Sequence, residues 1–232
     1  MSLRRFVRRW ASRRLDPDLD PRIRDYLALR FRPDRALPLA QASFVVLDTE
    51  TSGLDVRRDR LLSLSAVSVR AGRIVLSDRV ELTFAAASVG ASEAAVVHQL
   101  VTADLHGGVD EREGVAAFLA FVRDRVLVGH HVGFDVAMID RALARVGPVR
   151  LRNATLDTAR LHRRLTTGGI ASLTPDGPRP LGLDALAEAY GLDLPLRHSS
   201  AGDALATAQV FLALLARAAR RGITTLGALL ET

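Results

Sequence analysis

Three segments with the pattern of β-strands follow one another between Ser43 and Phe84, with no helical segment between them. The first is the apolar "FVVLD", the second is "LLSLSAVSVR" with alternating apolar and small polar residues, and the third, "RIVLSDRVELTF", alternates less regularly. Ala71 and Gly72 join the second segment to the third, and so short a connection is typical of a tight hairpin turn. The sequence therefore predicts a meander of three strands.

The rest of the chain is mainly helical, with one further strand. An amphipathic helix is predicted around "GVAAFLAFVRDR", a short buried strand at "VLVGH", and a helix at "DVAMIDRALARV" that stops at Gly147 and Pro148. Helical patterns follow at "LDTARLHRRL", "LGLDALAEAYG" and "GDALATAQVFLALLARAARR", and the Gly- and Pro-rich stretch 166–180 is interpreted as a loop. This order predicts an α/β fold with a mixed sheet, built from the three-strand meander plus a further strand or strands, flanked by helices.

Two absences from the composition limit the chemistry of this chain. Its 232 residues include no cysteine and no lysine, so all 32 basic residues are arginine. The absences exclude disulfides, zinc sites built on sulfur, Schiff bases and the lysine of a Walker-type phosphate loop. No apolar stretch approaches the roughly 20 residues that span a bilayer, so we expect no transmembrane segment and a cytoplasmic location.

Basic charge is concentrated at the N-terminus. Residues 1–36 hold eleven Arg against five Asp, whereas the remaining chain holds 21 Arg and 21 acidic residues. In this arm Leu3, Phe6, Val7 and Trp10 fall at helical spacing with arginines between them, which predicts a short basic amphipathic helix. Three roles stay open for it: docking on the main domain, contact with nucleic-acid phosphates, and contact with an anionic membrane surface.

Asp48 and Glu50 stand at the end of the first strand, in "DTETSGL". Because side chains alternate along a strand, these two carboxylates project from the same face. Two unpaired carboxylates repel and raise each other's pKa, so a cation or a proton must offset the repulsion. Mg²⁺ or Mn²⁺ fits best, since these hard cations prefer oxygen ligands and the chain has no lysine. The alternative is that the pair only begins a polar turn.

Two further acids stand near predicted helix starts. Asp135, in "GHHVGFD", lies where the short strand passes into a helix, and its alternative role is that of a favourable acid at a helix N-terminus. Asp203, in "RHSSAGDALAT", follows His198 by five residues, and its alternative role is in a capping box with Ser199 or Ser200 at the N-cap. Each alternative is adequate alone, but the acids together favour one shared metal site.

In order and spacing, these residues resemble the DnaQ-like DEDDh family of 3′-to-5′ exonucleases, which includes the proofreading subunit of bacterial replicative polymerase. "DTETSGL" matches the first motif, "HHVGFD" the second, and His198 with Asp203 the third, so the resemblance covers Ser43 to roughly Arg217. "VVHQL" near His98 and "LDT" at Asp157 also resemble segments of the family. The family has a ribonuclease-H-like fold, which agrees with the predicted meander and helices.

The resemblance implies a metal-dependent exonuclease that hydrolyses phosphodiester bonds at the 3′ end of a single strand, with two Mg²⁺ or Mn²⁺ ions per site. It implies that Asp48 bridges both ions, that Glu50 and Asp203 complete the first site, and that Asp135 supports the second. Ions about 3.5 to 4 Å apart stabilise both the attacking and the leaving oxygen of an in-line displacement. His198 is expected to be the general base, since an imidazole with a pKa of about 6.5 accepts a proton near neutral pH.

The same motifs imply substrate contacts from Thr51, Gly53, Leu54 and His131. His131 is a departure, because the family usually has Asn there, although neutral His also donates and accepts a hydrogen bond. DNA is the expected substrate, in replication or repair, and RNA is the alternative, because nothing in the sequence reads the 2′-hydroxyl. A different alternative is a catalytically weak adaptor on the same fold that binds nucleic acid or a polymerase.

The resemblance also divides the chain. We expect an arginine-rich, partly helical extension over residues 1–42, the exonuclease domain over residues 43–218, and a helical tail over residues 219–232. The expected partners are a single-stranded 3′ end and a DNA polymerase or another replication or repair protein.

Overall fold

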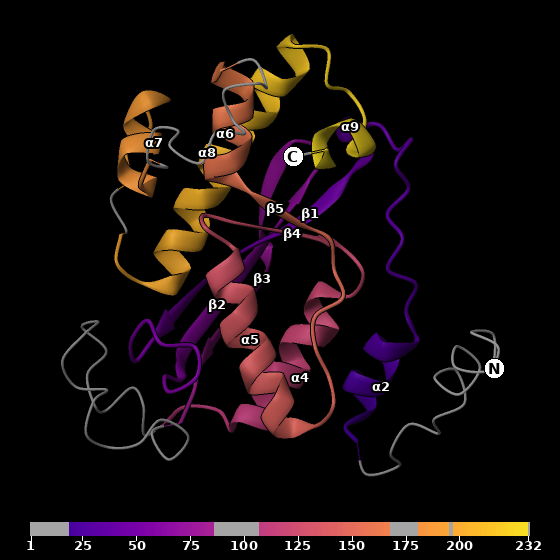
Figure 1. The fold of residues 1–232 in the computed structure, drawn as a ribbon, viewed down its shortest axis with the longest axis vertical. Helices are drawn as coiled ribbons and strands as arrows, with labels where there is room; N and C mark the ends of the chain where they lie inside the picture. Colours follow the sequence, from indigo (N-terminus) through magenta and orange to yellow (C-terminus); the bar gives the residue numbers. More distant parts are fainter. Residues whose placement is uncertain (1–18, 86–106, 168–180, 195–196, 232) are drawn as a thin grey trace, which may run out of the picture.

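A computed structural model describes residues 19–85, 107–167, 181–194 and 197–231 of the chain (Figure 1). Its centre is one sheet with the strand order β3-β2-β1-β4-β5. The first three strands are antiparallel, as the predicted meander requires, and the last two run parallel to β1. The strands are β1 (Ser43–Thr51), β2 (Leu61–Arg70), β3 (Arg73–Thr83), β4 (Val126–Gly129) and β5 (Thr155–Asp157).

The hairpin between β2 and β3 forms at the predicted place. Ala71 and Gly72 have φ angles of 49° and 66°, so both central residues lie in the left-handed region. Two left-handed residues are the requirement of a type I′ turn, whose twist matches that of the flanking strands.

Helices cover both faces of the sheet and divide the core into two clusters. Alternate side chains of β1 serve different clusters: Phe44 and Val46 join α8, whereas Val45 and Leu47 join α4 and α5. The mixed sheet with helices on both sides confirms the predicted fold class. One face is covered by α2 (Pro21–Ala28), α4 (Glu111–Val122) and α5 (Gly133–Val146), and the other by α6 (Thr158–Thr167), α7 (Leu183–Ala189), α8 (Ser200–Arg220) and α9 (Leu226–Leu230).

Strand β1 extends beyond its neighbour β4. The parallel ladder between them ends at Val46 and Val128, whereas β1 continues to Thr51 with β2 as its partner. A register shift between Glu50 and Thr51 then ends the regular pairing with β2. The last residues of β1 thus lie at the carboxyl end of the parallel strands, where ligands of open α/β sheets commonly bind.

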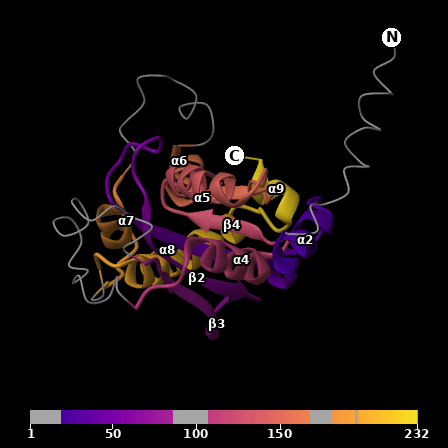
Figure 2. The same ribbon diagram turned by 90° about the horizontal axis from the view of Figure 1, so that it is seen from below.

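The N-terminal region, where the structure describes it, packs on the domain. Helix α2 lies beside α4 in both ribbon views (Figures 1 and 2), and its Ile23 and Tyr26 are buried. The Tyr26 hydroxyl donates to Asn153 Oδ1 at 2.6 Å and accepts from the Arg152 amide at 2.8 Å. The helix expected over Leu3 to Trp10 falls outside the described residues.

The segment before β1 forms backbone hydrogen bonds with the segment after α8. The amide of Leu39 donates to Thr224 O at 2.8 Å, and the amide of Leu226 donates to Leu37 O at 2.9 Å. The 3₁₀ turn Leu39–Gln41 leads from this contact into β1. Segments before β1 and after α8 therefore close the fold together.

Among the described helices, α8 is long enough and apolar enough to cross a membrane by length and composition alone. From the sequence alone this helix was not expected to span a membrane, because polar residues interrupt its apolar stretch. Phe211 and Leu214 of α8 are fully buried in the cluster that contains Phe44 and Val46. Its apolar face therefore belongs to the protein core.

Candidate active site

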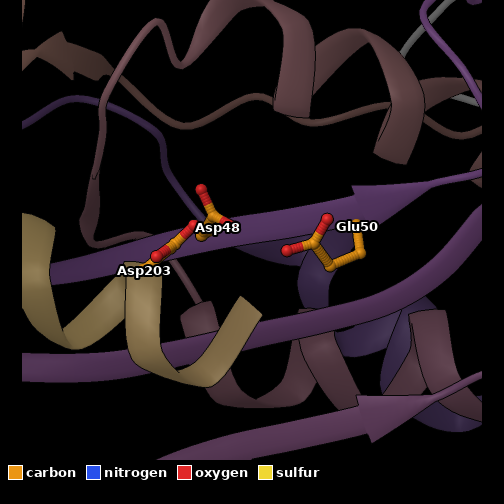
Figure 3. Close-up of side chains that lie close together, drawn as sticks. All are labelled: Asp48, Glu50 and Asp203. Atoms are coloured by element: carbon orange, nitrogen blue, oxygen red, sulfur yellow. The ribbon is translucent and has the colours of Figure 1, made fainter. Parts of the chain in front are cut away.

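Three of the predicted carboxylates meet at the end of β1. One carboxylate oxygen from each of Asp48, Glu50 and Asp203 lies within 4.8 Å of the others (Figure 3). Asp48 and Glu50 project from the same face of β1, and Asp203 reaches them from the start of α8, which packs on that face. Three oxygen donors at this spacing suit a hard divalent cation such as Mg²⁺ or Mn²⁺.

The start of α8 shows that helix capping does not explain Asp203. Ser199 is the N-cap, and its hydroxyl accepts from the Gly202 amide at 3.2 Å. Asp203 is therefore the fourth residue of the helix, one position beyond the acid of a capping box. Its Oδ1 accepts from the His198 amide at 3.2 Å, which fixes the carboxylate against the preceding segment.

Asp203 also forms an ion pair with Arg197, a residue that the sequence did not single out. Arg197 Nη1 pairs with Asp203 Oδ1, and Arg197 Nε donates to Asp184 Oδ1 at 2.6 Å. Burial opposes the charge on Arg197, but both carboxylates outweigh it and raise the pKa of the guanidinium above its ordinary value. The acidic cluster thus contains a positive charge of its own.

Asp135 lies in the first turn of α5 and is 4% exposed. Its Oδ1 accepts from the Thr49 amide at 3.1 Å and from the Thr49 hydroxyl at 2.7 Å. Because the β4 ladder ends at Val46, this carboxylate satisfies an amide of β1 that lies beyond the ladder. Asp135 is a helix N-terminal acid, as its alternative role required, but its hydrogen bonds tie it to the end of β1.

Burial is the main cause of the raised pKa values of Asp48 and Asp135. It raises the pKa of Asp48 well above the ordinary value, and the charges of Asp135, Asp203 and Glu50 raise it further. Burial likewise raises the pKa of Asp135 to about 7, although the hydrogen bonds from Thr49 act in the opposite direction. The end of β1 therefore holds charge that a proton or a cation must offset.

Both predicted functional histidines have left-handed backbone conformations. The φ angles are 59° for His131 and 70° for His198, and both residues are exposed. The left-handed region is uncommon for residues other than glycine, and Asn, Asp and His are several-fold enriched there. This preference gives a physical reason why His131 can stand where the family usually has Asn.

The residues after β1 form a turn that presents a leucine to solvent. The Thr51 hydroxyl donates to Gly53 O at 2.7 Å, and a Cβ on Gly53 would lie only 2.6 Å from Asp59 Oδ2. Asp59 Oδ2 also accepts from the Asp55 amide at 2.7 Å and so closes the turn. Leu54 is 85% exposed on this turn, directly beyond the acidic strand end.

Not every residue that resembled the family joins the site. Asp157 ends β5, and its Oδ1 accepts from the Ala159 and Arg160 amides at 2.9 and 3.1 Å, which stabilises the start of α6. His98 falls outside the described residues. Thr49 and Arg197 belong to the site but were not predicted, because the sequence shows neither the end of the β4 ladder nor the direction of the Arg197 side chain.

Comparison with known proteins identifies the family. A family model described as "Exonuclease" matches residues 45–211. The DNA polymerase III PolC-type of Lacticaseibacillus paracasei is 30% identical over 208 residues, which are 88% of this chain and 14% of that protein. The corresponding protein of Staphylococcus haemolyticus is 31% identical over 202 residues, 86% of this chain and 13% of that protein. The chain therefore spans about one-seventh of the length of these relatives.

Solved structures share the fold at lower identity. Exonuclease I of E. coli in complex with a dA16 oligonucleotide has a TM-score of 0.61 and 18% identity, covering 78% of this chain and 42% of that one. A moderately thermophilic exonuclease I from Methylocaldum szegediense has a TM-score of 0.60 and 23% identity, covering 76% of this chain and 41% of that one. These likenesses confirm the ribonuclease-H-like fold.

Proposed function

The chain belongs to the DnaQ-like DEDD family of 3′-to-5′ exonucleases, and we propose that it removes nucleotides from single-stranded 3′ ends in a reaction that requires divalent metal. The observation that carries the proposal is the meeting of three carboxylate oxygens within 4.8 Å at the end of a buried strand. An adaptor that only binds nucleic acid has no use for carboxylates that repel one another and the phosphates of its ligand.

The donor set fits the metal that the family implies. Asp48, Glu50 and Asp203 would hold one ion, and Asp48 with Asp135 would hold a second. Two bound ions would supply the charge that activates a water molecule and stabilises the leaving oxygen of a phosphodiester. Thr49 contributes by orienting Asp135 through two hydrogen bonds.

His198 is proposed as the general base. Its amide donates to Asp203 Oδ1, so its backbone is held beside a metal ligand while its ring stays exposed to solvent. From this position the ring would accept the proton of the attacking water. His198→Ala should lower kcat by about 10²- to 10⁴-fold and leave Mn²⁺ binding unchanged. A wild-type rate and pH profile in this variant would exclude His198 as the base.

We propose DNA as the substrate because the two relatives described above are DNA polymerases. Leu54, exposed beyond the acidic strand end, is proposed to contact the terminal nucleotide together with Thr51, Gly53 and His131. A DNA polymerase or another replication or repair protein is the proposed partner, and the cytoplasm is the proposed location. These assignments extend what is known of the family to this chain.

The proposal is tested by digestion of matched single-stranded DNA and RNA, labelled at either end, in Mg²⁺, Mn²⁺ or EDTA. We expect mononucleotides from the 3′ end in either metal and none in EDTA. Internal cleavage, or cleavage in EDTA at an undiminished rate, would contradict the proposal. Strand binding without cleavage would favour the adaptor. Faster digestion of RNA than of DNA would indicate that RNA is the substrate.

A further inference from the structure

The ion pair between Arg197 and Asp203 is more shielded from solvent than most of the ion pairs among the described residues. The side chains of Arg197 and Asp203 are 16% and 15% exposed, whereas that of Asp184, the second partner of Arg197, is 71% exposed. Pairs at exposed sites contribute little, because water and salt screen them. The hydrogen bond with Asp184 contributes most to the raised pKa of Arg197, but the charge of Asp203 acts on the guanidinium more strongly than the charge of Asp184 does.

The same carboxylate is needed by two different cations. Asp203 is one of the three residues whose oxygens meet at the proposed metal site, and its Oδ1 is the atom that the guanidinium contacts. A guanidinium keeps its proton throughout the physiological pH range, so its charge does not disappear near neutral pH. A divalent ion that binds Asp203 must therefore displace Arg197 or tolerate a positive charge beside it.

We propose that Arg197 is an exchangeable counter-ion: it neutralises Asp203 in the metal-free protein and gives the carboxylate up when a divalent cation binds. This inference rests on the proposed function, because it assigns a regulator of affinity to the same metal site. The hydrogen bond from Arg197 Nε to Asp184 persists during the exchange, so the guanidinium stays at the edge of the site. Arg197 thus acts through Asp203 as a positioning residue and sets the metal concentration that the enzyme needs.

The proposal predicts two effects of opposite sign for Arg197→Gln. Removal of a positive charge beside a divalent ion should tighten Mn²⁺ binding by about tenfold, from Coulomb's law at contact range in water. Removal of the only cation known to contact Asp203 in the described structure should lower the melting temperature of the metal-free protein. A merely structural role for Arg197 would instead weaken metal binding and lower stability together.

Two matched variants separate the effect of the charge of Arg197 from the effect of its hydrogen bond to Asp184. Arg197→Lys keeps the positive charge and should stay within about threefold of the wild-type Mn²⁺ affinity. Asp184→Asn removes the exposed partner alone and should change that affinity by less than about twofold. Tightening in both of these variants would contradict the assignment of the effect to the charge at Asp203.

The test is calorimetric titration of the full chain and its variants with Mn²⁺ at about pH 8, without nucleic acid. Tighter binding by Arg197→Gln than by wild type supports the proposal. Equal or weaker binding overturns it while the metal site of the proposed function stands. Absence of Mn²⁺ binding by the wild type overturns both.

A second measurement is made on the wild-type protein and uses Arg197→Lys only to assign a resonance. In wild-type protein labelled with ¹⁵N-arginine, the Nη–H resonance missing from Arg197→Lys identifies Arg197. Saturating Mg²⁺ should shift this resonance, since Nη1 leaves Asp203 while Nε stays on Asp184. An unshifted resonance at a Mg²⁺ concentration that saturates binding would overturn the exchange.

Discussion

The two halves of β1 are both largely buried, with Asp48 half-buried, but they differ in chemistry. Phe44 to Leu47 are apolar, no more than 1% exposed, and paired with β2 on one side and largely with β4 on the other. The second half begins at Asp48 and includes Thr49 and Glu50, which are 9% and 8% exposed, but here β4 has ended. One strand therefore passes from the core into the candidate site within a single residue.

The apolar half of the strand stabilises the fold, whereas the acidic half lowers its stability. Full burial of a large apolar side chain contributes about 1.5 to 3 kcal/mol, whereas a buried carboxylate is unfavourable unless it is paired. In the second half, the Thr49 hydrogen bonds to Asp135 and the Arg197 ion pair offset part of that cost. The proposed metal would offset the rest.

The comparison would break most visibly at Asp48. Asp48→Ala should lower the rate of 3′-end digestion by about 10³-fold or more, because it removes the carboxylate proposed to hold both ions. The variant should remain folded, since the change relieves repulsion in the metal-free site. The measurement is kcat with a circular-dichroism spectrum as control, and undiminished cleavage would show that the catalytic site lies elsewhere.

The neighbouring residue in the core should give the opposite result. Leu47→Ala should lower the free energy of unfolding by about 2 to 5 kcal/mol, because it leaves a cavity between β1 and the helices α4 and α5. Well below its melting temperature, the variant should keep its Mn²⁺ affinity. Urea denaturation measures the first effect and calorimetry the second. Loss of metal binding in a folded Leu47→Ala protein would mean that the two halves are not separable.

A smaller effect is expected from pH. The pKa of Asp135 rises from 3.8 to about 7 on folding, and that of Asp48 rises well above 3.8, so the folded protein holds protons that the unfolded chain has lost. The stability from these groups is lost as pH rises through their folded pKa values. Burial lowers the pKa of His130 from 6.5 to about 4 and also lowers that of His162, and these opposing contributions are complete only about one pH unit above the unfolded value of 6.5.

Between about pH 6.5 and 8.5 the free energy of unfolding of the metal-free wild type, measured relative to that of Asp135→Asn, should therefore fall by roughly 1 kcal/mol. Urea denaturation in EDTA at several pH values measures the slope. Asp135→Asn is the control, because it should flatten the slope while the histidines are unchanged. A difference between the wild type and Asp135→Asn that does not fall across this window would contradict the assignment.

The sequence predicted the elements whose signal is local. An apolar run located β1, and alternation with a short connection located the hairpin at Ala71 and Gly72. The two-residue period of a strand placed Asp48 and Glu50 on one face. Strand β5 was missed, because three residues are too few to show a period and it passes directly into α6. Helix α5 begins two residues before the predicted "DVAMIDRALARV", so Asp135 lies within its first turn.

Contacts between segments that are distant in the chain could not be predicted from the sequence. The position of Arg197 depends on the left-handed backbone at His198, which no local pattern indicates. Helix α2 is joined to the domain by a hydrogen bond from Tyr26 to Asn153, 127 residues away in the chain. The partner of Asp135 depends on where β4 stops along β1.

The acidic end of β1 is expected to lower stability until a cation binds there. The most direct test compares the melting temperatures of the wild type and Asp48→Asn at about pH 8, in EDTA and in saturating Mn²⁺. In EDTA the variant should melt higher, because one of the mutually repelling charges is gone. In Mn²⁺ the wild type should melt higher, because a ligand at about 100 times its Kd stabilises the folded state by roughly 2.7 kcal/mol. The account predicts this reversal of order, and the same order in both solutions would contradict it.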